Sequence, residues 1–150
     1  MLRKTVLWSA TALLAGISSF AAGDKLKVKD LPPAVQKTVM EQTKGATLVG
    51  LAKEVEKGKT VFELETRKPN GQTRDLMIDS AGAVLSVEEE VALESIPAPA
   101  REAIGKSANG GKITRVELLT EGKDVSYEAS IEKKGKKSSI SVKADGSLVK

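Results

Sequence analysis

The sequence predicts an α+β protein built from two tandem repeats, each an N-terminal helix packed on a four-stranded antiparallel meander sheet. Three observations lead to this prediction. The two halves of the chain align with each other, each half opens with a helical pattern, and strict alternation of apolar and polar residues follows each helix. Such alternation is typical of antiparallel strands that bury one face.

The alignment of the two halves keeps a nearly constant offset. The segment DLPPAVQKTVM at 30–40 matches SIPAPAREAIG at 95–105, an offset of 65 residues, and Phe62 then falls on Tyr127. After the next loop the offset becomes 64, and Gly82 falls on Gly146. Because apolar positions, glycines and the two aromatic residues beyond residue 21 agree together, a tandem duplication is predicted.

The first element of each predicted repeat is a helix. Asp30 and Ser95 are the predicted N-cap residues, and each is followed by proline in the first turn, where the missing N–H costs nothing. Apolar residues recur at helical spacing after them, and glycines at 45 and 110–111 are predicted to end the helices.

The strands follow with a period of two residues. Phe62 and Leu64 alternate with Glu63 and Glu65 in the first half, and the second half repeats this pattern over 125–132. The predicted turns between strands contain these glycines: Gly58, Gly71, Gly82, Gly122, Gly135 and Gly146. Because Phe62 and Tyr127 keep step with the aliphatic residues, both rings are predicted to be buried between helix and sheet.

Residues 1–21 have the pattern of a secretory signal peptide. Arg3 and Lys4 precede an uncharged, largely apolar run over 6–20, and Ser19-Phe20-Ala21 offers a small-x-small cleavage site. An uncleaved anchor is the alternative, but the run is shorter than the roughly 20 residues of a spanning helix. The predicted organisation is a signal peptide at 1–21, a short segment at 22–29, repeat 1 at 30–90 and repeat 2 at 91–150.

Composition excludes several functions. Two of the 24 Lys and Arg residues and none of the 20 Asp and Glu residues lie in 1–21, so the exported chain carries 22 basic and 20 acidic residues. This near balance predicts no nucleic-acid partner. Cysteine and histidine are absent from the sequence, which removes the usual metal ligands and the commonest general base. No enzyme activity, cofactor or metal is predicted.

The two halves are predicted to pack or pair with each other. A unit of about 60 residues buries only about 60% of its unfolded surface and is marginally stable alone. The connecting segment SVEEEVALES at 86–95 mixes apolar and acidic residues and is predicted to prolong the last strand of the first half.

These patterns resemble the PepSY-like family, which is similar to the β-lactamase-inhibitor fold. The matching positions of the first half are Leu31, Pro32, Val35, Glu56, Gly58, Phe62, Leu64, Ile78, Asp79, Gly82, Val84 and Leu85. Those of the second half are Ile96, Pro97, Ala100, Glu121, Gly122, Tyr127, Ala129, Val142, Asp145, Gly146, Leu148 and Val149. The resemblance implies an exported, non-enzymatic binding module that restrains proteases or other hydrolases. Lys143 departs from the pattern, because the first half has Asp79 at that position.

The outward face of the predicted sheet is the candidate binding surface for a protein or peptide of the cell envelope. Its predicted residues are Glu63, Glu65, Asp75, Glu128, Ser130 and Glu132. Acid–base chemistry by Glu63, Glu65 and Asp75 is the alternative. A solvated face is favoured, because no apolar surroundings are expected to shift a carboxyl pKa.

A lysine-rich hairpin is a second candidate site. It contains Lys133, Lys134, Lys136 and Lys137. These lysines could contact anionic lipid or polymer, or they could simply guard a strand edge against aggregation. The exported chain is expected to be soluble, in the periplasm or outside the cell, and not to span a membrane.

Overall fold

The computed structural model describes residues 26–149. The predicted signal peptide at 1–21 lies outside this range, as do residues 22–25. Within the described part, no helix combines the length and hydropathy that crossing a bilayer requires.

Two helices and seven strands form the fold, with a short 3₁₀ turn before each helix. In chain order the elements are η1 (Val28–Asp30), α1 (Pro33–Gln42), β1 (Thr47–Glu56), β2 (Lys59–Arg67), β3 (Thr73–Asp79), β4 (Val84–Glu90), η2 (Leu93–Ser95), α2 (Ala98–Ala108), β5 (Lys112–Glu121), β6 (Asp124–Lys133) and β7 (Lys136–Val142).

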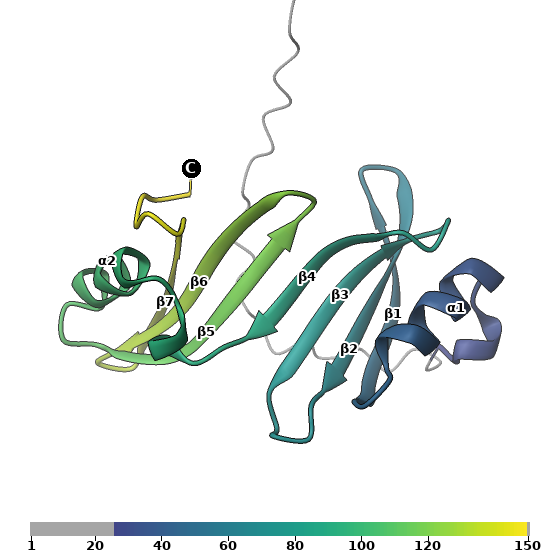
Figure 1. Cartoon of the computed structure of the whole chain (residues 1–150), viewed down its shortest axis with the longest axis horizontal. Helices are drawn as coiled ribbons and strands as arrows, with labels where there is room; N and C mark the ends of the chain where they lie inside the picture. The colour runs from purple at the N-terminus through teal and green to yellow at the C-terminus, as the bar shows by residue number, and fades with distance from the viewer. Residues whose placement is uncertain (1–25, 150) are drawn as a thin grey trace, which may run out of the picture.

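All seven strands belong to one antiparallel sheet in the order β1 to β7, with α1 and α2 at its opposite ends (Figure 1). The prediction of two repeats with a four-stranded sheet each is therefore wrong. Strands β4 and β5 pair directly, from Ser86 opposite Glu121 to Glu90 opposite Glu117. This pairing satisfies the backbone groups of two strands that would otherwise be exposed sheet edges.

Among residues 26–149, the second half forms three strands rather than the four predicted. After the turn that follows β7, Leu148 forms an isolated bridge to Val142. The prediction that the halves pair is confirmed, because β4 pairs with β5. The prediction that the 86–95 segment prolongs a strand is confirmed in part, because β4 runs only to Glu90 and Leu93–Ser95 form η2.

Both helices pack on the same face of the sheet. Val35 and Val39 of α1 contact a core that includes Leu64, Leu76 and Ile78. We call the pairing of β4 with β5 the seam. On the other side of the seam, α2 packs on Val116, Ala129 and Val142. The register connects the two cores, because Leu76 lies opposite Val87 and Val87 lies opposite Thr120. Opposed residues share a face, so the other face carries neither helix.

The buried position predicted for Phe62 is confirmed, since this side chain is only 3% exposed. Tyr127 is partly buried and packs against the second core, so its ring is less enclosed than predicted.

The predicted helix caps are wrong. Asp30 and Ser95 each end a 3₁₀ turn, and Pro32 and Pro97 occupy the N-cap positions without a side-chain hydrogen bond. Between turn and cap, Leu31 and Ile96 have extended backbones and are buried. Burial of these two apolar side chains separates each 3₁₀ turn from its helix, so the capping pattern is overridden by packing.

Candidate functional site

Carboxylates gather on the face of the sheet opposite the helices, which we call the open face. Across β2, β3 and β4, Glu65 lies opposite Asp75, and Asp75 lies opposite Glu88. Across β4, β5 and β6, Glu90 lies opposite Glu117, and Glu117 lies opposite Glu128. Neighbouring strands are about 4.8 Å apart, so these two rows form one acidic surface that crosses the seam.

The structure brings some predicted site residues together. Glu63, Glu65 and Asp75 share the open face of β2 and β3, and Glu128 joins them through the residues of β4 and β5. Glu128 also accepts a hydrogen bond from Ser141 Oγ at 3.1 Å. Ser130 and Glu132 lie further along β6, toward the lysine-rich hairpin.

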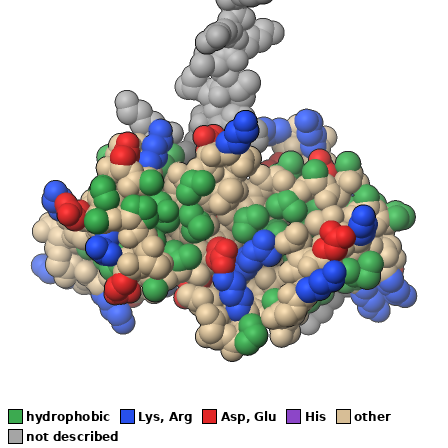
Figure 2. Space-filling model, viewed as in Figure 1, with side chains coloured by type: hydrophobic (Ala, Val, Ile, Leu, Met, Phe, Trp, Pro, Cys, Tyr) green, Lys and Arg blue, Asp and Glu red, His purple; other side chains and the backbone are tan. Residues whose placement is uncertain are grey.

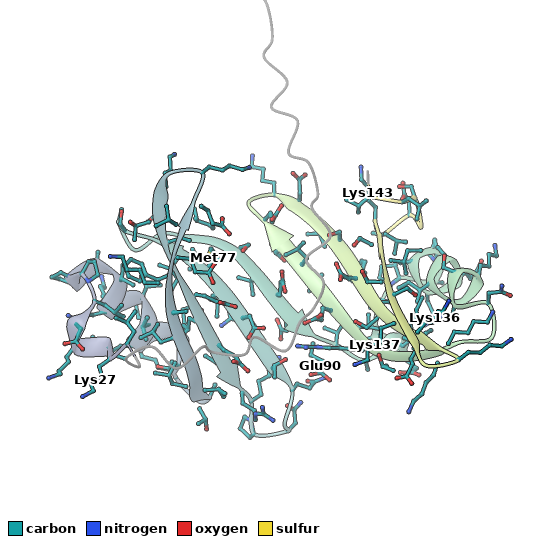
Figure 3. All side chains as sticks on the ribbon, turned by 180° about the vertical axis from the view of Figure 1, so that it is seen from behind. Lys27, Met77, Glu90, Lys136, Lys137 and Lys143 are labelled. Atoms are coloured by element: carbon teal, nitrogen blue, oxygen red, sulfur yellow. The ribbon has the colours of Figure 1, made fainter. Side chains whose placement is uncertain are left out.

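Sequence reasoning missed four residues in the middle of this face. They are Glu88, Glu90, Arg115 and Glu117. The sequence pattern that could have identified them is the alternation in SVEEE at 86–90 and TRVELLTE at 114–121, which assigns each residue to one face of its strand. Met77 and Glu90, labelled in Figure 3, alternate on the same face as Asp75 and Glu88.

Arg115 connects the two halves of the chain across the open face. Its Nη2 lies 2.8 Å from Glu117 Oε1, and the same atom donates a hydrogen bond to Thr73 Oγ1. Thr73 belongs to β3 and Arg115 to β5, so the guanidinium extends across β4. Arg115 Nε is buried without a hydrogen-bond partner.

Four carboxyl groups of this face, those of Glu63, Asp75, Glu88 and Glu117, have raised pKa values. Burial, repulsion from Glu117 and further repulsion from Asp75 and Glu128 raise the pKa of Glu88 to about 7, against the opposing pull of Arg115. Burial and Glu65 raise the pKa of Asp75 to about 6.

Two further carboxyl groups show the same effect. The pKa values of Glu63 and Glu117 are also raised, chiefly by burial. The expectation of unshifted, solvated carboxylates is therefore wrong for Glu63 and Asp75. Besides burial, like charges on adjacent strands contribute: Glu65 lies opposite Asp75, and Glu54 and Asp75 both repel Glu63.

These raised pKa values imply a specific dependence of stability on pH. Unfolding returns Glu88 to an ordinary pKa near 4.5, so the folded chain binds more protons between about pH 4.5 and 7, and the free energy of unfolding falls as pH rises through that window. We expect Glu88→Gln to stabilise the protein at pH 8 by about 1–2 kcal/mol, after allowance for solvent screening, and by little at pH 4. Urea denaturation at both pH values measures this difference.

Glu132→Gln is the matched control, because Glu132 lies on the same face but at its exposed end. It should change stability equally little at pH 4 and pH 8. A Glu88→Gln variant with the same stability difference from the parent at both pH values would contradict the raised pKa of Glu88.

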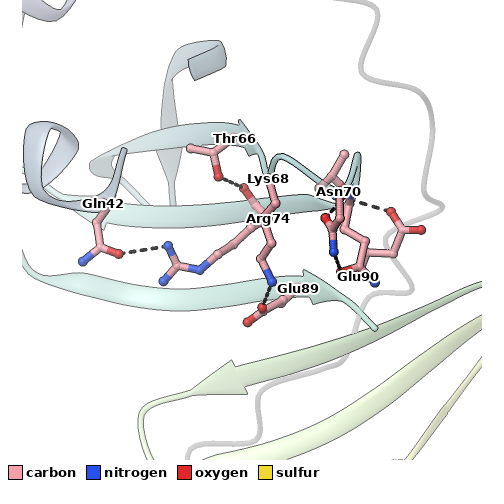
Figure 4. Close-up of polar contacts among 9 residues, drawn as sticks. Gln42, Thr66, Lys68, Asn70, Arg74, Glu89 and Glu90 are labelled. Atoms are coloured by element: carbon pink, nitrogen blue, oxygen red, sulfur yellow. Dashed lines mark hydrogen bonds and ion pairs between the residues drawn. The ribbon is translucent and has the colours of Figure 1, made fainter. Parts of the chain in front are cut away.

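Polar contacts also fix the loop between β2 and β3 (Figure 4). Arg74 Nη1 donates a hydrogen bond to Gln42 Oε1 at 3.0 Å, which ties β3 to the end of α1. Lys68 forms an ion pair with Glu89 of β4. Glu90 accepts a long hydrogen bond of 3.4 Å from the backbone N–H of Thr73. The start of β3 is thus held from both faces of the sheet.

The carboxyl groups in the middle of the open face do not line the groove beside the β1–β2 hairpin. This groove, of about 980 Å³, is lined by residues that include Leu31 and Phe62 but none of Asp75, Glu88 or Glu117. Among residues 26–149, no set of three or more acidic side chains has the geometry of a metal site. The open face thus presents charged side chains that are available for contact.

The lysine-rich hairpin turns at Lys134 and Gly135, both with positive φ, and its four lysines are exposed. Lys133 Nζ donates a hydrogen bond to the carbonyl of Asn109 at the end of α2. Lys137 lies opposite Glu132 in the β6–β7 register. Lys133 thus satisfies a backbone carbonyl at the end of α2, and Lys137 lies next to a carboxylate.

Comparisons with known proteins establish the fold. No protein-family profile and no curated protein matches the sequence. A proposed periplasmic protein of Bacteroides eggerthii has a TM-score of 0.64 at 16% identity, with 80% of this chain and 86% of that one covered. For a DUF2874 family protein of Bacteroides ovatus the values are 0.62, 17%, 80% and 85%.

A third solved structure carries a more informative description. A BLIP-like protein of Bacteroides fragilis has a TM-score of 0.57 at 20% identity, with 78% of this chain and 82% of that one covered. The fold is therefore consistent with that of BLIP-like proteins. At these identities the likeness extends to the fold alone, and the PepSY-like resemblance and the tandem duplication remain predictions.

Proposed function

We propose that this chain is an exported, non-catalytic binding module that docks a protein partner on its open face. The observation that carries the proposal is the continuous acidic surface, which extends across the seam between β4 and β5 and is covered by neither helix. Export rests on the predicted signal peptide at 1–21, and the resemblance of the fold to BLIP-like proteins supports binding over catalysis.

The chemistry of the open face sets the kind of binding. The two aromatic residues within 26–149, Phe62 and Tyr127, lie on the helix side of the sheet, so this face has no aromatic anchor. Contact through charged groups predicts moderate affinity that falls as salt is added. Restraint of a protease or other hydrolase is the form of binding that the BLIP-like fold suggests.

The opposite side of the molecule differs in character. In the view of Figure 2, hydrophobic patches lie among single scattered charges, without a continuous acidic area. Glu41, Glu94 and Glu102 are exposed carboxylates on α1, η2 and α2 and therefore provide a matched control for the open face.

The proposal is tested by reversing charge on the open face. We expect the triple variant Glu63→Lys, Glu65→Lys and Glu128→Lys to capture at least about tenfold less partner from a native envelope fraction while it keeps the cooperative thermal unfolding of the parent. The control variant Glu41→Lys, Glu94→Lys and Glu102→Lys carries the same net charge and should capture as well as the parent. Quantitative mass spectrometry of the captured proteins measures both. Equal capture by the open-face variant and the parent would eliminate this face.

A further inference from the structure

We propose that the partner segment docked on the open face is an extended, lysine- or arginine-rich polypeptide. This inference deepens the proposed function and rests on it. The chain beyond residue 21 has nearly balanced charge overall, but its acidic residues are concentrated on the open face. The open-face positions of β2 to β6 hold these acidic residues: Glu63, Glu65, Asp75, Asp79, Glu88, Glu90, Glu117, Glu121, Asp124, Glu128 and Glu132. The basic residues at such positions are Lys59, Arg67, Lys112 and Arg115, so acidic residues remain in clear excess.

The carboxylates of this face remain largely uncompensated within the described chain. Asp75 Oδ1 is buried without a hydrogen-bond partner. Glu88 faces Asp75 on β3, Glu65 on β2, Glu117 and Arg115 on β5 and Glu128 on β6, and of these only Arg115 is a cation. A ligand that brought further cations would relieve repulsion among groups that the fold holds close together.

Arg115 shows how this face accommodates a cation. Its guanidinium extends across β4 and contacts both Glu117 on β5 and Thr73 on β3. A guanidinium or ammonium group from a partner would meet the same chemistry at the remaining carboxylates. The geometry therefore favours a cationic ligand over an anionic or an apolar one.

The dimensions of the acidic surface indicate an extended segment. From β2 to β6 it spans four strand spacings, or about 19 Å, and an extended chain covers that distance with about six residues. Side chains that point the same way along such a chain recur about every 7 Å, so three or more cations can reach the two rows of carboxylates.

The test uses two labelled decapeptides, one alternating Lys-Ser and one alternating Glu-Ser, titrated with the purified chain by fluorescence anisotropy at pH 8 and low salt. We expect the Lys-Ser peptide to bind and the Glu-Ser peptide not to bind. The open-face variant Asp75→Asn, Glu88→Gln and Glu117→Gln should weaken Lys-Ser binding at least about tenfold. The control variant Glu41→Gln, Glu94→Gln and Glu102→Gln removes the same charge elsewhere and should weaken it less than about twofold.

Acidity provides a second readout. Protonation of Asp75 and Glu88 removes two negative charges from the middle of the surface. Binding of the Lys-Ser peptide should therefore weaken between pH 8 and pH 5.5. The double variant Asp75→Asn and Glu88→Gln should have a smaller dependence on pH over that range than the parent. Equal losses in the two triple variants, or equal binding of the two peptides, would overturn the proposal.

Failure of this inference is distinguishable from failure of the proposed function. Should the Lys-Ser peptide not bind while envelope capture still depends on Glu63, Glu65 and Glu128, the open face docks a partner of another chemistry and only the cationic assignment is lost. Should capture be independent of those three residues, the proposed docking face itself is wrong.

Discussion

Replacement of Phe62 by alanine is expected to lower the free energy of unfolding by about 3–5 kcal/mol. The ring is 3% exposed and lies in the first core with Leu64, Leu76 and Ile78 beneath α1. Its removal forfeits the transfer of a large apolar side chain from water and leaves a cavity that strands β1 to β3, held in register, cannot close. Equilibrium urea denaturation, followed by circular dichroism, measures the loss.

Two further variants show whether the loss has this cause. Phe62→Leu keeps most of the apolar volume and should cost under about 1.5 kcal/mol. Val55→Ala removes apolar atoms from the adjacent strand at a position that is 69% exposed, and it should change stability by less than about 0.5 kcal/mol. A loss below about 1 kcal/mol for Phe62→Ala would place the ring outside the core.

A single methyl group at Gly82 is expected to destabilise the fold by about 2–4 kcal/mol. Gly82 has φ +85°, and a Cβ there would lie 2.7 Å from the carbonyl oxygen of Ala34, in the first turn of α1. The hydroxyl of Thr38 donates a 2.6 Å hydrogen bond to the carbonyl of Gly82, so the β3–β4 turn and the helix are in direct contact. Gly82→Ala would add backbone strain and force the turn away from α1.

Gly71→Ala separates these two contributions. Gly71 has a similar φ of +89°, but its added Cβ would meet nothing within 4 Å. This variant should therefore show only the backbone strain, about 1–2 kcal/mol. Thermal and urea denaturation of both variants give the comparison. Equal losses at Gly71 and Gly82 would mean that the turn does not rest on the helix.

Much of the local structure could be predicted from the sequence. The apolar positions of 62–64 and 125–131 assigned these strands a buried face, and the structure places Phe62, Leu64, Ala129 and Ile131 in buried positions. All six glycines predicted in turns between strands have positive φ, a backbone conformation that residues with a Cβ rarely adopt. Such features depend on a few neighbouring residues, so the local pattern is enough to identify them.

The candidate site was only partly predictable. Alternation assigned Glu65, Asp75 and Glu128 to the outer face, but their mutual distance depends on which strands are neighbours. The residues that join them, Glu88 and Glu117, gain their position from the β4–β5 pairing. The raised pKa values of Glu88 and Glu117 depend on that pairing too, because it buries both groups and places them among like charges on adjacent strands.

The sequence by itself determined where the chain turns, which side chains share a face and much of the buried core, because each of these follows from side-chain chemistry at short range. Tertiary structure alone decided that one seven-stranded sheet forms, and with it the acidic surface that runs across both halves. The physical reason is that strands pair through backbone N–H and C=O groups, which almost every residue carries. A side-chain pattern can therefore specify the face of a strand without specifying its neighbour.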